Sequence, residues 1–251
     1  MKLGSTADGE RRTRVVAVGG AKGSPGCTFV AVGLARCFAD HGLPTMLIDA
    51  DGEEGGVGTA LALPGRRQAD LGRAAALGVD PGVLRDAAIE ASPRLWVLEI
   101  GAGELGDQAP DGREVVTAAR LDHQVVVVDL GHAWSRLQRQ FAAAADWLLW
   151  VAVPDRQGLE RADRALGRLL HGGGRGLVVN RSARWSLRGA DRALVERHAI
   201  PLVARLPEHR AAARRVSERS APAHRQRQFR GGFRLLARTV HPDVEGGGKW
   251  P

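Results

Sequence analysis

Lys22 is the residue whose type and position most directly suggest chemistry. The 251-residue chain contains thirty-three arginines but only three lysines, and the other two, Lys2 and Lys249, lie near its ends. A compact ammonium group fits against a phosphate in a tight loop, where a planar guanidinium group is a poor substitute. Lys22 is therefore expected to contact phosphate in a nucleotide-binding loop. The alternative is chance retention of one lysine in an arginine-biased sequence.

The loop around this lysine is residues 21–28, Ala-Lys-Gly-Ser-Pro-Gly-Cys-Thr, between an expected strand (14–18) and an expected helix (28–41). Glycines let backbone N–H groups turn toward phosphate oxygens, and the start of the helix favours an anion. The Thr28 hydroxyl would hold Mg²⁺. The usual pattern is G-x-x-x-x-G-K-[ST], but this loop has alanine at the first glycine and Cys27 at the lysine. Alone, the loop is an incomplete match.

Three aspartates follow expected buried strands. Asp49 ends the strand expected at 44–49, Asp51 follows it, and Asp129 comes after four consecutive valines in the strand expected at 124–130. An unpaired carboxylate is costly in an apolar interior. These side chains are therefore expected either to cap turns or to belong to a functional site.

Short β-branched runs alternate with helical patterns along the chain. Runs such as valines 125–128 are typical of strands buried on both faces of a parallel sheet. The alternation predicts an α/β fold with a doubly wound, mostly parallel sheet over residues 14–241, between a disordered N-terminus (1–13) and a flexible tail (242–251). The expected strands are 14–18, 44–49, 95–99, 124–130, 147–153, 176–180 and 202–205, and the expected helices are 28–41, 113–120, 158–170, 189–198, 207–220 and 226–240.

Composition narrows the class of protein. No apolar run approaches the roughly 20 residues that cross a membrane, and the polar N-terminus resembles no signal peptide, so a cytoplasmic protein is expected. Cys27 and Cys37 would lie on one helix, too far apart to bridge, and are expected to be reduced thiols. Without a CxxC pair, neither a metal cluster nor a disulfide framework is expected. Trp147 and Trp150 are expected to pack in the core.

The positive charge is concentrated near the C-terminus. The net charge is +8, and residues 205–241 hold ten arginines against Glu208 and Glu218. Such a basic region predicts an acidic partner, whether non-specific DNA, an anionic membrane or an acidic protein. The alternative is a solvated, arginine-rich helical surface. The helix expected at 226–240 contains Gly231 and Gly232, which weaken it, so closing the core is a better prediction for it than lying on a membrane.

From Val15 to Ile200 the sequence resembles the MinD/ParA superfamily of P-loop ATPases. Lys22 lies where the deviant Walker A motif of that superfamily, K-G-G-x-G-K-T, has its signature lysine. Further motifs follow in the family order, which makes the match far more specific than a lone glycine loop. They are the D-x-D motif at Asp49 and Asp51, the Walker B strand ending at Asp129, the strand and loop 149–155, the adenine-reading pair Asn180 and Arg181, and the closing loop at Pro207 and Glu208.

The resemblance implies a deviant Walker A P-loop NTPase fold that binds ATP and Mg²⁺. Lys22 would reach the phosphates of the partner in a nucleotide-dependent homodimer. Asp49 and Asp51 would orient the attacking water or sense the nucleotide. The implied metal ligands are Thr28, Asp51 and Asp129. The implied nucleotide-binding residues are Gly23, Ser24, Pro25, Gly26, Cys27, Thr28, Phe29, Asn180, Arg181 and Pro207.

Cys27 sets this chain apart from an active ATPase. A thiol is neutral and a weak donor, so nucleotide binding is expected to survive while hydrolysis is slow or absent. The sequence 23–26 followed by a non-lysine residue looks most like the CpaE/TadZ branch, which implies localisation of pilus or secretion machinery, at the membrane or cell pole, or a role with division proteins. A ParA-type partition ATPase and a small-molecule ligase related to dethiobiotin synthetase are the alternatives.

Overall fold

The computed structural model describes residues 13–21, 25–51, 56–63, 78–100, 110–132, 134–168, 172–183, 188–211 and 222–242. Eight strands form one sheet in the order β3-β4-β2-β5-β1-β6-β7-β8. All neighbouring pairs are parallel except β3 with β4, so the predicted doubly wound, mostly parallel sheet is confirmed. The strands are β1 Arg14–Gly20, β2 Thr45–Asp49, β3 Ile89–Ser92, β4 Leu95–Glu99, β5 Val125–Gly131, β6 Trp147–Ala152, β7 Gly174–Ser182 and β8 Leu202–Pro207.

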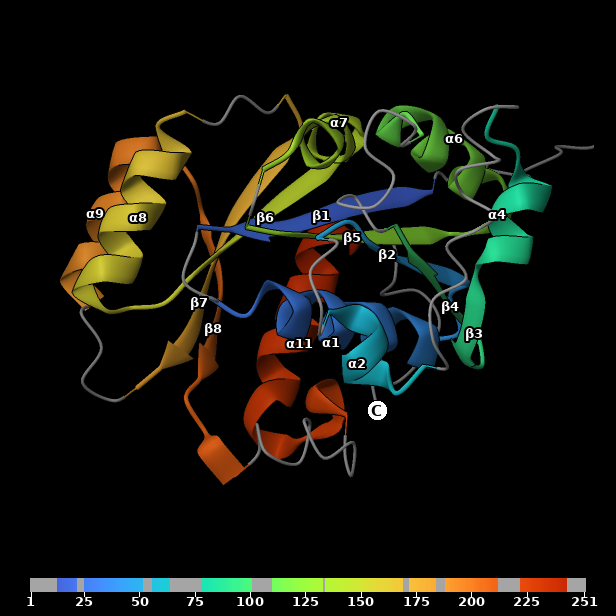
Figure 1. The fold of residues 1–251 in the computed structure, drawn as a ribbon. Helices are drawn as coiled ribbons and strands as arrows, with labels where there is room; N and C mark the ends of the chain where they lie inside the picture. The colour runs from blue at the N-terminus through green and yellow to red at the C-terminus, as the bar shows by residue number, and fades with distance from the viewer. Residues whose placement is uncertain are drawn as a thin grey trace, which may run out of the picture.

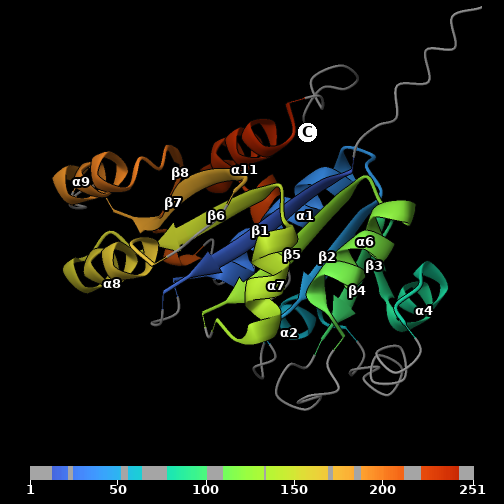
Figure 2. The same cartoon turned by 90° about the horizontal axis from the view of Figure 1, so that it is seen from above.

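Helices cover both faces of this sheet (Figures 1 and 2). α1, α2 and α11 lie on one face, while α4, α6, α7, α8 and α9 pack on the other. The helices are α1 Cys27–Asp40, α2 Val57–Leu61, α4 Pro81–Ala87, α6 Gly112–Asp122, α7 Arg136–Ala144, α8 Arg156–Leu166, α9 Arg188–His198 and α11 Arg227–Val240, with a 3-10 turn, η2, at Ala223–Arg225.

The two faces have differently organised cores. Side chains alternate along β1, so that Val16 and Val18 point toward α1 while Val15 and Ala17 point toward α6 and α7. The α1 face has one continuous apolar core. The other face is divided between a cluster under α4, α6 and α7 and a second cluster under α8 and α9. The division lies over β6, between α7 and α8.

The C-terminal helix closes the core on the α1 face, as predicted. α11 buries Phe229, Phe233, Leu236, Ala237 and Val240. The glycine pair does not break this helix. A Cβ atom on Gly232 would lie 2.5 Å from the Leu206 side chain, so this glycine permits the close contact with β8.

Several elements differ from the sequence prediction. The helix expected at 207–220 is wrong at its start, because β8 continues to Pro207 and helical backbone appears only at 210–211, before the described segment ends. The pattern also missed β3, α2, α4 and α7. These elements are short, so periodicity carries little signal; α7 is instead marked by a capping box between Ser135 and Gln138.

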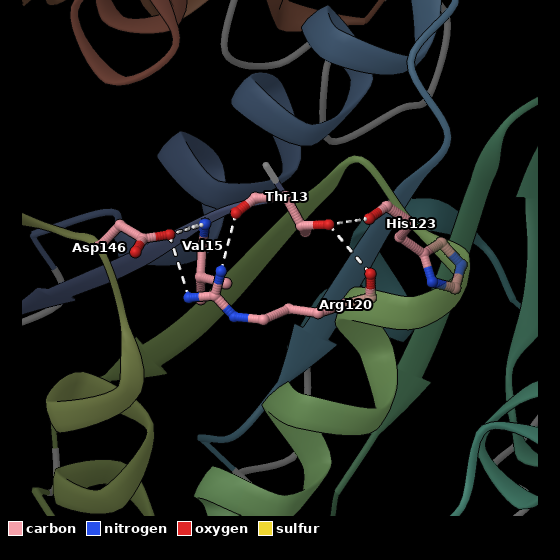
Figure 3. A network of polar contacts seen from close by, with 5 residues as sticks. All are labelled: Thr13, Val15, Arg120, His123 and Asp146. Atoms are coloured by element: carbon pink, nitrogen blue, oxygen red, sulfur yellow. Dashed lines mark hydrogen bonds and ion pairs between the residues drawn. The ribbon is translucent and has the colours of Figure 1, made fainter. Parts of the chain in front are cut away.

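A polar network closes the amino-terminal edge of the sheet (Figure 3). One carboxylate oxygen of Asp146 accepts hydrogen bonds from the Val15 backbone N–H (2.8 Å) and from Arg120 (3.1 Å). Arg120 also donates to the Thr13 carbonyl (2.8 Å), and the Thr13 hydroxyl donates to the carbonyls of Arg120 and His123. The network joins the start of β1 to the end of α6 and the start of β6.

Neither a disulfide nor a membrane-spanning helix is found in the described part of the chain. Cys27 and Cys37 both lie on α1 as buried free thiols, as predicted. None of the helices in the described ranges has the length and apolarity to cross a bilayer.

Candidate functional site

The head of α1 is fixed to the neighbouring strand β7. Gly26 precedes the helix in a left-handed conformation, with φ +91°. A Cβ atom there would lie 2.4 Å from the amide nitrogen of Asn180, so only glycine fits. The Asn180 amide donates to the Pro25 carbonyl (2.8 Å). The end of the phosphate loop is therefore held on β7. The predicted residues Lys22, Gly23 and Ser24 lie outside the described residues.

Three acidic residues lie side by side at the carboxyl-terminal edge of the sheet. The strand register aligns Glu99 of β4 with Asp49 of β2, and Asp49 with Asp129 of β5. One Asp49 oxygen accepts the N–H of Val57 at the start of α2 (2.8 Å), and the other accepts the N–H of Asp51 (3.1 Å). The structure therefore brings the predicted Asp49 and Asp129 together and uses Asp49 to fix the chain on both sides of residues 52–55.

Asp129 is the most unusual member of this row because it is completely buried. One of its oxygens accepts the Gly131 N–H (3.1 Å), whereas Oδ2 has no hydrogen-bond partner among the described residues. Burial, followed by the nearby charge of Asp49, raises the pKa of Asp129 to about 7, against the lowering effects of the Thr28 hydroxyl and the Gly131 N–H. An unpartnered buried carboxylate oxygen of this kind is suited to bind a cation or its water.

Asp51 lies against the segment that follows Asp129. Gly131 has φ +53°, and a Cβ atom there would overlap the Asp51 carboxylate. The Gln138 side chain donates to the Leu130 carbonyl (2.7 Å) and lies 3.5 Å from an Asp51 oxygen. Asp51 is thus close to the segment that follows Asp129, and both residues belong to the predicted set of metal ligands. Gln138 of α7 hydrogen-bonds to Asp51 and to this segment.

Cys27 is buried at the first position of α1. Burial, together with the negative charges of Asp129 and Asp51, raises the pKa of its thiol well above the ordinary value. Cys27 is therefore a neutral thiol at neutral pH and supplies no positive charge to the loop. The ring of the adjacent Phe29 packs on Phe229 and Phe233 of α11, with ring centroids 5.1 Å and 5.9 Å apart. The side chain of Phe29, a predicted nucleotide-binding residue, is therefore part of the contact between α1 and α11.

The predicted adenine-reading residues meet at the ends of β7 and β8. Arg181 has φ +55°, and its N–H donates to the Asn180 side-chain oxygen (2.9 Å). Ser182 pairs with Pro207, which places Pro207 close to Arg181. A pocket of about 210 Å³ is lined by Pro25 and Arg181 together with the loop after β6. Part of the Asn180 amide is already used within the protein, so its place in base recognition remains a prediction.

These residues fit a magnesium–nucleotide complex. Thr28 offers a hydroxyl beside Asp129, and Asp129 offers an unpartnered oxygen at the head of a helix whose N-terminus favours phosphate. In the described part of the chain, no three or more His, Cys, Asp or Glu side chains form a cage for a metal ion. Mg²⁺ in nucleotide sites commonly takes one or two protein oxygens and completes its shell with water and phosphate.

Several residues of this region were not predicted from the sequence. Glu99 ends an expected strand beside Asp49, a position that topology alone brings into line. Gln138 lies on the helix that the pattern missed. Trp134 has φ +53°, donates its indole N–H to the Gly20 carbonyl (3.2 Å) and stacks on Trp150 at 5.3 Å. No sequence motif marks Trp134; only its position after the Asp129 segment is a signal.

A mostly parallel eight-stranded sheet with a loop-to-helix turn after its central strand defines an α/β fold of the P-loop NTPase class, and this chain has the fold of the MinD/ParA ATPases. The cell division ATPase MinD of Pyrococcus furiosus superposes with a TM-score of 0.73 at 19% identity, covering 91% of this chain and 98% of that one. A ParA family ATPase from Chlorobium tepidum superposes with a TM-score of 0.72 at 18% identity, covering 93% of this chain and 98% of that one. The septum site-determining protein MinD of Pyrococcus horikoshii, complexed with Mg-ADP, superposes with a TM-score of 0.71 at 18% identity. The match covers 93% of this chain and 98% of that one. No protein-family model matches the sequence. No curated protein matches it either.

Proposed function

We propose that this protein binds ATP and Mg²⁺ and acts as a MinD/ParA-like positioning or scaffold protein with slow or absent hydrolysis. The observation that carries the proposal is the pairing of Thr28 with the buried, half-unpartnered Asp129 at the head of α1. The MinD of Pyrococcus horikoshii, which has the same fold, is complexed with Mg-ADP.

The metal ion would be held by Thr28 and, through water, by Asp129 and Asp51. It would neutralise charge on the phosphates. Asp129 is suited to bind the metal through water because its Oδ2 lacks a partner among the described residues. The N–H groups at the start of α1 would meet the phosphates, and Asn180 keeps that helix start in place through Pro25. Asp49 would anchor the chain after β2.

Slow hydrolysis follows from Cys27. The usual loop lysine brings a positive charge to the β- and γ-phosphates. A buried neutral thiol brings none, and loss of one charge-assisted contact costs about 1.5–3 kcal/mol in binding. The effect on rate is larger, because charge that develops in the transition state lacks its partner. The site is therefore expected to respond to nucleotide binding more than to turn nucleotide over.

The cellular role is proposed from the resemblance. Lys22 would contact the partner's phosphates in a nucleotide-dependent homodimer. The fold is shared with proteins named for cell division and septum-site determination. The loop sequence resembles the CpaE/TadZ branch, so we place the function in localisation of pilus or secretion components, with septum-site determination as the nearest variant.

Calorimetric titration with ATP–Mg²⁺ tests the proposal. Wild-type protein is expected to bind with micromolar affinity, and Lys22→Ala is expected to weaken binding by about tenfold or more, which is about 1.4 kcal/mol. Lys2→Ala is the matched control and is expected to bind like the wild type. Absence of heat at millimolar ATP would refute nucleotide binding.

Restoring the lysine tests the second half of the proposal. Cys27→Lys is expected to raise ATP turnover by at least about tenfold, whereas Cys27→Ala should leave it unchanged. Turnover by the wild type at about 1–100 s⁻¹, the range of efficient kinases, would contradict slow hydrolysis.

The alternative is a ParA-type partition ATPase that binds non-specific DNA. α11 supports it, because Arg227 and Arg230 are exposed on its outer face. Other arginines of the basic region serve internal contacts: Arg205 pairs with Asp191, and Arg225 with Asp40. DNA binding that falls steeply with salt, and that weakens in Arg227→Ala/Arg230→Ala, would favour this role. The same variant tested on anionic vesicles distinguishes a membrane from DNA.

A further inference from the structure

The face of the sheet opposite α1 contains a large cavity that the proposed nucleotide site does not use. It lies between α7 and α8, where the apolar core of that face is divided, and it has a volume of about 870 Å³. Leu148 and Trp150 of β6 form part of its wall. The volume is within the range of about 300–1,000 Å³ that is typical of small-molecule sites.

Two tryptophans give this cavity an aromatic wall. Trp134 and Trp150 both line it, and their rings stack with centroids 5.3 Å apart and planes at 24°. Trp134 is held by its N–H bond to the Gly20 carbonyl (3.2 Å), while Arg139 donates to the Trp134 carbonyl (2.6 Å). The aromatic wall is thus fixed in place, and rigid indoles are good stacking surfaces for a planar ring.

Four arginines surround the same cavity. Arg139 comes from α7, Arg161 and Arg164 from α8, and Arg168 from the turn after α8. No acidic side chain is among the described residues that line the cavity, and neither Arg164 nor Arg168 forms an ion pair within the described ranges. Guanidinium groups bind phosphate through paired, charge-assisted hydrogen bonds. The rim therefore favours an anion, and phosphate in particular.

We propose that this cavity is a second ligand site, which takes an aromatic compound that carries phosphate, such as a nucleotide. The ring would enter against Trp134, which is stacked on the buried Trp150, and the phosphate would meet Arg164 of α8 and Arg168 beyond its end. This proposal is independent of nucleotide binding at the head of α1. Ala21 and Arg161 line both the cavity and the pocket beside Pro25 and Arg181, so the two sites are neighbours.

The test is calorimetric titration with 5′-AMP and, separately, with inorganic phosphate, both in EDTA so that no Mg²⁺ complex forms. AMP is expected to bind saturably with a Kd below about 1 mM, and phosphate at least about tenfold more weakly because it has no ring. Arg164→Gln/Arg168→Gln is expected to weaken AMP binding by at least about tenfold. Arg156→Gln/Arg192→Gln is the matched control, since both arginines are exposed helix residues outside the cavity, and it should leave binding unchanged.

Two further variants locate the bound AMP. Ala143 is exposed on α7 and lines the cavity, so Ala143→Glu is expected to abolish binding by charge, whereas Ala143→Gln, of similar size, should retain it. Thr28→Ala should not affect AMP. Absence of saturable AMP binding, or equal weakening by the control arginine pair, would overturn the proposal. So would loss of AMP binding in Thr28→Ala alone, which would place the nucleotide in the loop site and leave the proposed function intact.

Discussion

At the amino-terminal edge of the sheet, Asp146 accepts hydrogen bonds from Val15 and Arg120, whereas at the carboxyl-terminal edge one oxygen of the fully buried Asp129 has no partner among the described residues. The same amino-terminal edge holds Asp40 at the end of α1, where Arg225 donates to it (2.7 Å) and His224 also contacts it. Both edges bring carboxylates into the protein, but Asp129 at the carboxyl-terminal edge keeps an oxygen that no described residue satisfies.

The pKa values separate the two edges in the same way. Burial alone would raise the pKa of Asp40, but hydrogen bonds from Arg225 and His224 outweigh it and lower the pKa below the ordinary value. Burial and Asp49 raise the pKa of Asp129 to about 7. At the amino-terminal edge, the partners of Asp40 stabilise its charged form. At the carboxyl-terminal edge, the charged form of Asp129 is destabilised by burial, and a bound cation would offset that cost.

Asp129→Asn is expected to have the largest effect. The folded pKa of Asp129, about 7, lies above its ordinary value of 3.8, so the folded protein binds an extra proton between these values. The free energy of unfolding therefore falls as pH rises through this window and stays low above it. The variant should lack this loss and be more stable than the wild type at pH 8, by on the order of 4 kcal/mol, with little difference at pH 4.

Denaturant unfolding in EDTA from pH 4 to pH 8 measures this effect, and titration with ATP–Mg²⁺ should show that the same variant loses binding. A stability difference that is equal at all pH values would contradict the raised pKa. A stabilised variant that still binds ATP–Mg²⁺ normally would remove Asp129 from the metal site.

Asp146→Ala, at the opposite edge, is expected to lower the free energy of unfolding by about 2 kcal/mol, because it leaves Val15 N–H and Arg120 without their acceptor. Nucleotide binding should be unchanged. Asp122→Ala is the control, since its ion pair with Arg85 is exposed and contributes about 0–1 kcal/mol. Urea unfolding measures both variants. Weaker ATP binding in Asp146→Ala would contradict the view that the amino-terminal edge contributes to stability and not to nucleotide binding.

Asn180→Ala tests whether the loop attachment serves binding as well as stability. It removes the bonds to Pro25 and Arg181, so we expect a loss of about 1 kcal/mol in stability. ATP–Mg²⁺ affinity is expected to fall by about tenfold in calorimetry, because the helix start is no longer held in place. Ser182→Ala on the same strand is the control and should change neither quantity. An unchanged affinity would make Asn180 a purely structural residue.

Arg225→Ala should have the smallest effect. Its ion pair with Asp40 is partly exposed, so we expect a loss of about 0.5 kcal/mol that diminishes at high salt. Arg227→Ala, on the exposed face of α11, is the comparison variant and should be neutral in urea unfolding. A loss above roughly 2 kcal/mol would show that the Asp40 cluster behaves as a buried ion pair instead.

Much of the fold could be predicted because its signals are local. The valine run of β5 and the apolar run of β6 identified central parallel strands, and the loop between β1 and α1 was placed by its glycines and Thr28. β3 and α2 were missed because four or five residues contain too little periodicity. The helix expected at 207–220 was placed too early, since Pro207 still pairs with Ser182.

The candidate site was predictable only in part, for a physical reason. The sequence by itself determined that Asp49 and Asp129 end buried parallel strands, and therefore that both lie at the carboxyl-terminal edge of the sheet. It also determined that Cys27 takes the place of a lysine. Only the tertiary structure decided that Asp129 keeps an unpartnered oxygen, that Glu99 joins the acidic row, and that Trp134 and the arginines of α8 surround one cavity. Burial, strand order and the spacing of helices depend on contacts between distant segments, and no local pattern encodes them.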